Sequence, residues 1–141
     1  MVGRNPMMSE IKFRGKRIDN GELTYGHLCY IENEPVIITG YVKQIDGSLF
    51  HCNTFYFIIP ETVGQYTGLK DKNGREIYEG DLVAVADYAN WEGLYKIIWD
   101  EKNLMYMLED AFGDREKLCE FEEYLVKGNI YENPELLEGM V

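Results

Sequence analysis

The sequence predicts a mainly β protein, a sandwich or barrel of eight or nine short strands. Aromatic residues make up 13% of the chain and include 11 tyrosines, which favours β structure because flat rings pack well on a pleated surface. Apolar and polar residues alternate over short stretches, and turn signals separate these stretches at close, regular intervals. This pattern is not that of an α/β fold, in which strands alternate with long helices.

The first half of the chain alternates between strand-like stretches and glycine turns. Asn20-Gly21 readily supplies the positive φ angles of a hairpin turn, and a second turn is predicted at 46–48. The run "FYFII" at 55–59 shows no alternation, so we expect it either to be buried on both faces or to lie at the seam between two lobes. Strands are predicted over residues 11–19, 23–31, 36–45 and 49–60.

The second half contains further strands, a loop at 90–93 and a short helix. We expect turns at Asn73-Gly74 and at 101–103, and strands from Leu82 and over 94–100, 104–110 and 125–131. Spacing of apolar residues within 114–125, at Leu118, Phe121 and Leu125, predicts one or two helical turns. At 134–138 a terminal helix is predicted, with Asn133 as N-cap, Pro134 at the first position and Gly139 at its end.

The 141 residues fit a single domain with two lobes. We expect a flexible stretch at 1–10 and one domain over 11–141, divided into an N-terminal β lobe at about 11–60, a barrel lobe at about 61–132 and the terminal helix. No run is long enough to span a membrane and the first residues lack the pattern of a signal peptide, so a cytoplasmic location is expected.

The net charge of −11 disfavours nucleic acid and anionic membranes as partners, unless the basic residues are segregated. An acidic protein can instead attract basic partners. Some segregation is visible near the start of the chain. A nucleic-acid-binding surface would use these basic residues beside exposed aromatic residues such as Trp91, which lies in a glycine-flanked loop. The basic candidates are Lys12, Arg14, Lys16, Arg17 and Lys43.

Two kinds of chemical site are weighed and disfavoured. Paired acids can divide the acid and base roles of a hydrolase, but such clusters arise freely among 25 acidic residues. Histidine and cysteine could hold zinc, but their spacing matches no closed zinc motif, and buried free thiols are the simpler interpretation. We expect no metal and no cofactor. The acids are Asp71, Glu76, Glu79 and Asp81, and the candidate ligands are His27, Cys29, His51, Cys52 and Cys119.

The stretch "TGLKDKNGREIYEGDLV" at 67–83 combines acids with glycine turns, as an active loop would. Each residue type nevertheless has a role in turn chemistry. Gly80 can adopt a conformation that other residues avoid, and Asp81 can accept hydrogen bonds from turn N–H groups before the next strand. A Gly-Asp pair before an apolar strand is typical of small SH3-type barrels, so the stretch indicates fold more than function.

Two segments, "QYTGLKDKNGREIYEGDLV" at 65–83 and "GNIYENPELL" at 128–137, resemble the two characteristic stretches of the YopX family. The start, "IKFRGKRIDNGEL" at 11–23, is also similar, while Lys127 stands where the family commonly has isoleucine. The resemblance implies a phage or prophage origin. It also implies a mainly β fold, with a small SH3-type barrel, additional N-terminal strands and hairpins, and a short C-terminal helix. It carries no catalytic or binding residues onto this chain.

The leading hypothesis is a non-enzymatic phage accessory protein that acts through protein–protein contacts. It would form a homo-oligomer and contact an unknown phage or host protein, because two-sided apolar strands and many tyrosines can furnish interfaces. The alternative is a nucleic-acid-binding module that uses the N-terminal basic residues.

Overall fold

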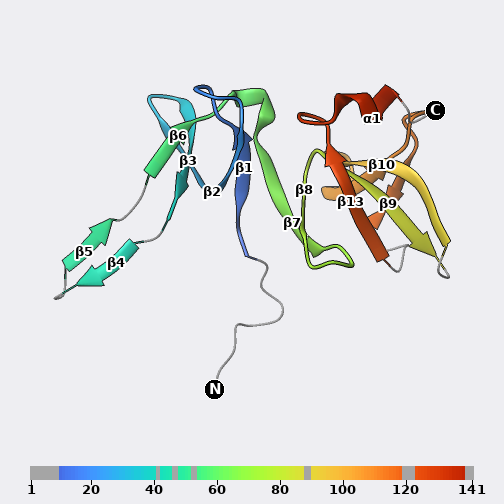
Figure 1. The fold of residues 1–141 in the computed structure, drawn as a ribbon, viewed down its shortest axis with the longest axis horizontal. Helices are drawn as coiled ribbons and strands as arrows, with labels where there is room; N and C mark the ends of the chain where they lie inside the picture. The colour runs from blue at the N-terminus through green and yellow to red at the C-terminus, as the bar shows by residue number, and fades with distance from the viewer. Residues whose placement is uncertain are drawn as a thin grey trace, which may run out of the picture. The chain divides into compact units, whose positions relative to one another are not determined.

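Two compact units divide the chain in the computed structural model, Met1–Gln65 and Tyr66–Val141. Both are built from antiparallel strands (Figure 1). The lobes expected from the sequence divide at residue 60, five residues before this boundary. The structure describes residues 10–40, 42–45, 48–51, 54–87, 90–118 and 123–138; for 42–45, 48–51, 87 and 90–92 it describes the backbone alone.

The first unit contains a sheet in the order β6-β3-β2-β1. The hairpin turn after β1 has the predicted Gly21 at a φ of +73°, and the Gly21 N–H donates to the Arg17 carbonyl oxygen at 3.0 Å. A separate hairpin, β4 with β5, is inserted between β3 and β6 (Figure 1). The strands are β1 (Phe13–Lys16), β2 (Leu23–Ile31), β3 (Glu34–Thr39), β4 (Val42–Ile45), β5 (Ser48–His51) and β6 (Thr54–Phe57).

The core of the first unit lies around β3. Val36 and Ile37 have no exposed surface, and Ile58 is 1% exposed. At Gly26, an added Cβ would meet the carbonyl oxygen of Ile38 on the neighbouring strand, so glycine is required there by close backbone approach. An isolated bridge between Arg17 and Ile58 joins the end of β1 to the end of β6.

The second unit holds a five-stranded sheet in the order β12-β11-β10-β9-β13. A 3₁₀ turn, η1 (Pro60–Thr62), and β7 (Gly64–Lys70) lead the chain into this unit, where β7 pairs with β8 (Glu76–Tyr78). The remaining elements are β9 (Asp81–Asp87), β10 (Asn90–Asp100), β11 (Met105–Glu109), β12 (Arg115–Lys117), β13 (Glu123–Asn129) and α1 (Pro134–Glu138).

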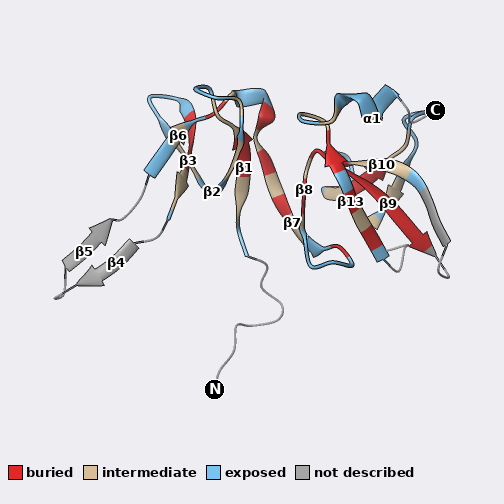
Figure 2. Ribbon diagram, viewed as in Figure 1, coloured by how far each residue is buried: buried red, intermediate tan, exposed pale blue. Residues whose placement is uncertain are grey.

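Strand β9 is the centre of the second core. All five residues from Leu82 to Ala86 are at most 6% exposed, so the strand is buried on both faces (Figure 2). Around it, Ile77, Ile97, Leu108 and Val126 form one apolar cluster. Irregular pairing between Glu92 and Tyr95 in β10, and between Val126 and Gly128 in β13, bends the sheet.

The mainly β class and the short C-terminal helix are confirmed, whereas a closed barrel is not seen: among the described strands no pairing joins β12 to β13. Within the same residues no helix is long and apolar enough to cross a membrane.

Four local predictions were wrong in part. The expected strand at 36–45 is broken at Gly40, whose φ is +93°, into β3 and β4. Residues 90–93 belong to β10 rather than to a loop, because they pair with the end of β9. Leu125 lies in β13 and Arg115–Lys117 is a strand, so the helical turns predicted within 114–125 do not include those residues. Leu118 has 3₁₀ conformation, and residues 119–122 lie outside the described part.

The fourth concerns the run at 55–59, which is not buried on both faces. Phe55 is 52% exposed and Phe57 is 38% exposed, and their rings meet edge to face at 5.9 Å.

Candidate functional site

An open apolar groove of about 590 Å³ lies on the second unit. Its aliphatic part comes from the end of β7, the β10–β11 turn, the start of β11 and the residue after β12: Leu69, Leu104, Met105 and Leu118. Thr67 also lines the groove, and its hydroxyl donates to the Ile77 carbonyl oxygen at 2.8 Å. Because these segments are far apart in the sequence, the groove forms only in the tertiary fold.

Three aromatic residues complete the groove: Trp99, Tyr106 and Tyr124. Trp99 ends β10 and Tyr106 faces it across the strand pair, with ring centroids 5.0 Å apart and planes at 68°. Trp99 is 41% exposed. Burial and, secondarily, the negative charge of Glu79 raise the pKa of Tyr106 to about 12, so its phenol stays protonated at neutral pH.

Leu104 is presented to solvent in an unfavourable conformation. It is 73% exposed and has a φ of +53°, a left-handed conformation that costs a residue with a Cβ about 1 kcal/mol. Glycine or asparagine would be the favoured residue at such a turn position. Leu104 therefore contributes an exposed apolar surface at the edge of the groove.

Electrostatically, the second unit is strongly acidic while the first is nearly neutral. The second unit holds 18 of the 25 acidic and 8 of the 14 basic residues, a net charge of −10, against −1 for the first. Among the described residues that line the groove there is no lysine, arginine, aspartate or glutamate. The groove is therefore an uncharged patch in a negative field.

Two acids of the 67–83 stretch, Asp71 and Asp81, accept hydrogen bonds from the backbone. Asp71 is 7% exposed, and its two oxygens accept the N–H groups of Asn73 and Arg75 at 2.9 Å and of Val126 at 3.0 Å. Burial raises the pKa of Asp71, but these N–H donors together outweigh it and lower the pKa. Asp81 is 1% exposed and accepts the N–H of Tyr78 at 2.8 Å.

These bonds explain the stretch structurally. Asp71 fixes its own turn and ties it to β13, 55 residues away, while Asp81 closes the turn before β9. Within the described residues no three His, Cys, Asp or Glu side chains gather at one place. Glu76 accepts a hydrogen bond from the hydroxyl of Tyr78 at 3.1 Å. For Asp71 and Asp81 the arrangement is that of scaffolding.

The comparisons with known proteins now decide the family. The family model of the YopX protein matches residues 12–138, nearly the whole chain. This chain belongs to the YopX family. Its solved structural neighbours include protein EF1440 from Enterococcus faecalis, with a TM-score of 0.60 and 27% identity, over 92% of this chain and 99% of that chain. No curated protein matches the chain significantly.

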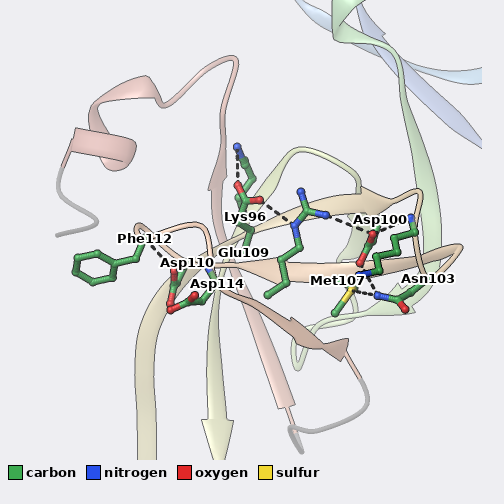
Figure 3. Close-up of polar contacts among 10 residues, drawn as sticks. Lys96, Asp100, Asn103, Met107, Glu109, Asp110, Phe112 and Asp114 are labelled. Carbon is green, nitrogen blue, oxygen red and sulfur yellow. Dashed lines mark hydrogen bonds and ion pairs between the residues drawn. The ribbon is translucent and has the colours of Figure 1, made fainter.

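In this YopX-family protein a row of ion pairs crosses β10, β11 and β12, as Figure 3 shows. Glu109 contacts Lys96 at 3.4 Å and the Nε of Arg115 at 3.2 Å, and Arg115 also contacts Asp100 at 3.3 Å. Asp100 in turn accepts the side-chain N–H of Asn103 at 2.8 Å. The charges satisfy one another across three strands, so they stabilise the sheet and leave no open charged site in this row.

The basic residues proposed for nucleic acid do not form a free cationic patch in the described part. Arg14 is 1% exposed, so this candidate is corrected: its guanidinium is part of the interior of the first unit. Arg17 bonds both oxygens of Asp19, at 2.8 and 2.6 Å, and Lys12 lies 3.4 Å from Glu10. Lys16 is half-buried. The side chains of Lys43 and Trp91 lie outside the described residues.

The candidate zinc ligands are only partly described. His27 is exposed and Cys29 half-buried on β2, two residues apart and so on one face. The side chains of His51, Cys52 and Cys119 lie outside the described residues, so the zinc hypothesis is not tested on this set.

Sequence reasoning did not find the groove. The sequence predicted Trp99 in one strand and Tyr106 in the next. The spacing of these residues does not indicate that β7 and β13 lie beside the same end of the β10–β11 pair. The one signal available was Leu104, an apolar residue directly after the turn residues 101–103.

Proposed function

We propose that this YopX-family protein is a non-enzymatic binding module of phage or prophage origin that acts in the bacterial cytoplasm through protein–protein contacts. Its second unit would receive a peptide segment of a phage or host partner in the groove. The observation that carries the proposal is the exposed pair Trp99 and Leu104, at 41% and 73% exposure, on the edge of an apolar groove. Tryptophan is enriched among residues that dominate binding energy.

Charge supports a basic partner segment. The net charge of −10 on the second unit attracts positive groups and repels polyanions, and such a field raises association rates with complementary partners. It also repels a second copy of the same unit, so self-association would have to use the nearly neutral first unit. The expected homo-oligomer stays a prediction, to be tested by analytical ultracentrifugation.

The nucleic-acid alternative has weaker support. A binding surface for a phosphate backbone needs several accessible cations, yet Arg14 is buried and Lys12 and Arg17 lie against acids. Gel-shift assays with single- and double-stranded DNA and RNA at low salt test it directly. Retention that weakens steeply with salt would favour this alternative.

We also propose that the five-stranded sheet of the second unit, together with β8, represents the SH3-type barrel implied by the family resemblance. The irregular pairings in β10 and β13 support strong curvature of this sheet. An experimental structure tests it: continuous strand pairing around the unit would establish the barrel, and a gap between β12 and β13 would reject it.

The binding function is tested with a displayed library of random peptides. We expect enrichment of peptides that combine apolar and basic residues. Replacement of a central tryptophan commonly costs 2 kcal/mol or more, so Trp99→Leu should weaken binding of an enriched peptide by about 30-fold. Leu104→Asn should also weaken binding, while the free energy of unfolding stays equal or rises because the strain at φ +53° is relieved.

The matched control is Phe112→Leu. Phe112 is 80% exposed in the same unit, at the turn between β11 and β12, but does not line the groove. This variant should bind as the wild type does. Equal loss in the Phe112 and Trp99 variants, or no enriched peptide at all, would contradict the proposal.

A further inference from the structure

Two turns of the chain contain the pair Asn-Gly, Asn20-Gly21 in the first unit and Asn73-Gly74 in the second. In such a pair the backbone nitrogen of glycine can attack the side-chain amide carbon of asparagine, because glycine has no Cβ that obstructs the approach. The new C–N bond closes a succinimide ring, and the amide nitrogen leaves as ammonia together with the proton of the glycine N–H. Water then opens the ring at either carbonyl carbon, which gives aspartate or isoaspartate without an oxidant or a cofactor.

The backbones of the two turns are closely similar. Gly21 has a φ of +73° and Gly74 a φ of +81°, and both asparagines are exposed. Each glycine N–H donates to a carbonyl oxygen at 3.0 Å, that of Arg17 in the first turn and that of Asp71 in the second. Backbone conformation therefore does not separate the two pairs, and a difference in their reactivity has to come from the side chains around them.

The side-chain amide of Asn20 is held by hydrogen bonds. Its Oδ1 accepts the N–H of Glu22 at 2.9 Å, and its Nδ2 donates to the Glu22 carboxylate at 3.3 Å. Asn73 is bonded to Asp71 through its backbone N–H, and among the described residues none bonds its side-chain amide. The amide carbon of Asn73 can therefore turn toward the Gly74 nitrogen without first losing a side-chain hydrogen bond.

The charges next to the two pairs differ in sign. The second pair stands between Lys72 and Arg75, in the sequence "KNGR", whereas the first stands between two acids, in "DNGE" at 19–22. Negative charge develops on the glycine nitrogen as it loses its proton, and on the amide oxygen as the ring closes. Adjacent cations therefore favour the reaction and adjacent acids oppose it.

One further charge beside each pair opposes this difference without cancelling it. Arg17 bonds Asp19 next to the first pair, and Asp71 lies two residues before Asn73. The Asp71 carboxylate accepts three backbone N–H groups that offset its charge, while the Glu22 carboxylate lies 3.3 Å from the amide nitrogen of the first pair. We propose that Asn73 is a site of spontaneous deamidation and that it reacts ahead of the asparagine of the first turn.

Deamidation at Asn73 acts on a turn that is tied to β13. Lys72 donates its N–H to the carbonyl oxygen of Tyr124 at 2.9 Å, and Tyr124 lines the groove. Either product adds a negative charge at position 73, and isoaspartate also lengthens the backbone there by one carbon, which shifts the N–H of Arg75 away from Asp71. This consequence, unlike the reaction itself, rests on the proposed binding function: the groove loses affinity for its partner as the protein ages.

The test follows both asparagines in the full chain during incubation at mildly alkaline pH in heavy-oxygen water. Peptide mapping by mass spectrometry locates the heavy oxygen, which marks only residues that react during the incubation. We expect Asn73 to react about 10-fold faster than Asn20 in the folded chain, since the bonded amide of Asn20 must first be released. In guanidinium chloride, which removes the hydrogen bonds and screens the charges, the two rates should converge.

Two variants separate the causes, and in each the other pair is the internal reference. Glu22→Ala removes the carboxylate beside Asn20 and should speed the reaction there, while Arg75→Gln removes a cation and should slow the reaction of Asn73. The assignment is overturned if Asn20 reacts as fast as Asn73 in the folded wild-type chain. It is equally overturned if folded Asn73 stays intact over a time in which guanidinium chloride allows its conversion.

The effect on the groove is measured separately, with an enriched library peptide and three samples: fresh protein, aged protein and aged Asn73→Gln, whose longer side chain closes the corresponding ring far more slowly. We expect the aged wild type to lose affinity and the aged variant to keep it. Equal affinity of fresh and aged wild type would overturn the effect on the groove while the mapped site stands. If no peptide is enriched, the binding function and this effect fall together, and the mapping still decides the deamidation site.

Discussion

Removing the Asp71 carboxylate should destabilise the second unit far more than its turn position suggests. Its Oδ1 accepts two N–H groups within the turn, and its Oδ2 accepts the N–H of Val126, a residue only 7% exposed. In Asp71→Ala, the two turn groups can bond water, at a joint cost of about 1 kcal/mol. The Val126 N–H cannot, and leaving it unsatisfied costs about 2 kcal/mol more.

The chain supplies a matched control in Asp110. Its Oδ1 also accepts the N–H groups two and four residues later, of Phe112 at 2.8 Å and Asp114 at 3.0 Å, but among the described residues no bond joins its side chain to a distant strand. Asp110→Ala should therefore cost about 1 kcal/mol, the turn contribution alone. The difference between the two variants isolates the bond to β13.

Urea unfolding followed by tryptophan fluorescence measures both variants, because Trp91 and Trp99 belong to the second unit. We expect Asp71→Ala to lose about 3 kcal/mol of unfolding free energy with an unchanged m value. Losses equal within about 0.5 kcal/mol for Asp71→Ala and Asp110→Ala would refute the reasoning, since the bond to Val126 would then contribute nothing.

Two further predictions concern pH and backbone packing. The pKa of Asp71 is lowered despite burial, by its N–H donors, and that of Asp100 mainly by the Asn103 side chain, so both favour folding when ionised. Stability from these groups is present above the unfolded pKa of about 3.9 and is lost as pH falls through the lower folded values. Their contribution to the urea midpoint should therefore be similar at pH 7 and 4.5 and should fall between pH 4.5 and 3; an unchanged midpoint at pH 3 would contradict this. Gly26→Ala should destabilise the first unit by about 2 kcal/mol, because its Cβ meets the backbone oxygen of Ile38. Thermal unfolding followed by circular dichroism measures this loss. Gly74→Ala is the control, because a Cβ added at Gly74 would meet no neighbouring atom within 4 Å and only the φ of +81° is unfavourable for alanine.

Turn chemistry could be predicted because it depends on neighbouring residues alone. Asn20-Gly21 and Asn73-Gly74 stand at turns as expected, and Pro134 opens α1. Predictions that needed a partner strand were weaker. Residues 90–93 carry loop-like composition, yet pairing with β9 makes them a strand. The apolar residues in 114–125 have helical spacing, yet the two ends of that segment are strands because they pair with β11 and β9.

Candidate binding residues were least predictable, because exposure is decided by packing. Arginine is usually found at the surface, yet Arg14 is buried. Phenylalanine is usually found in the core, yet Phe55 is 52% exposed. Asp71, weighed from the sequence as an acid of a hydrolase, is buried where its carboxylate meets the N–H of Val126 in β13.

By itself the sequence determined the mainly β class, the turns at Asn20-Gly21 and Asn73-Gly74, the family and the net negative charge, since each follows from local residue patterns or composition. Only the tertiary structure decided which side chains share a surface. It brings β7, β10, β11 and β13 together around Trp99 and Tyr106, and it turns Asp71 and Asp81 toward backbone N–H groups. The physical reason is that both depend on contacts between segments far apart in the chain, and no local pattern encodes these.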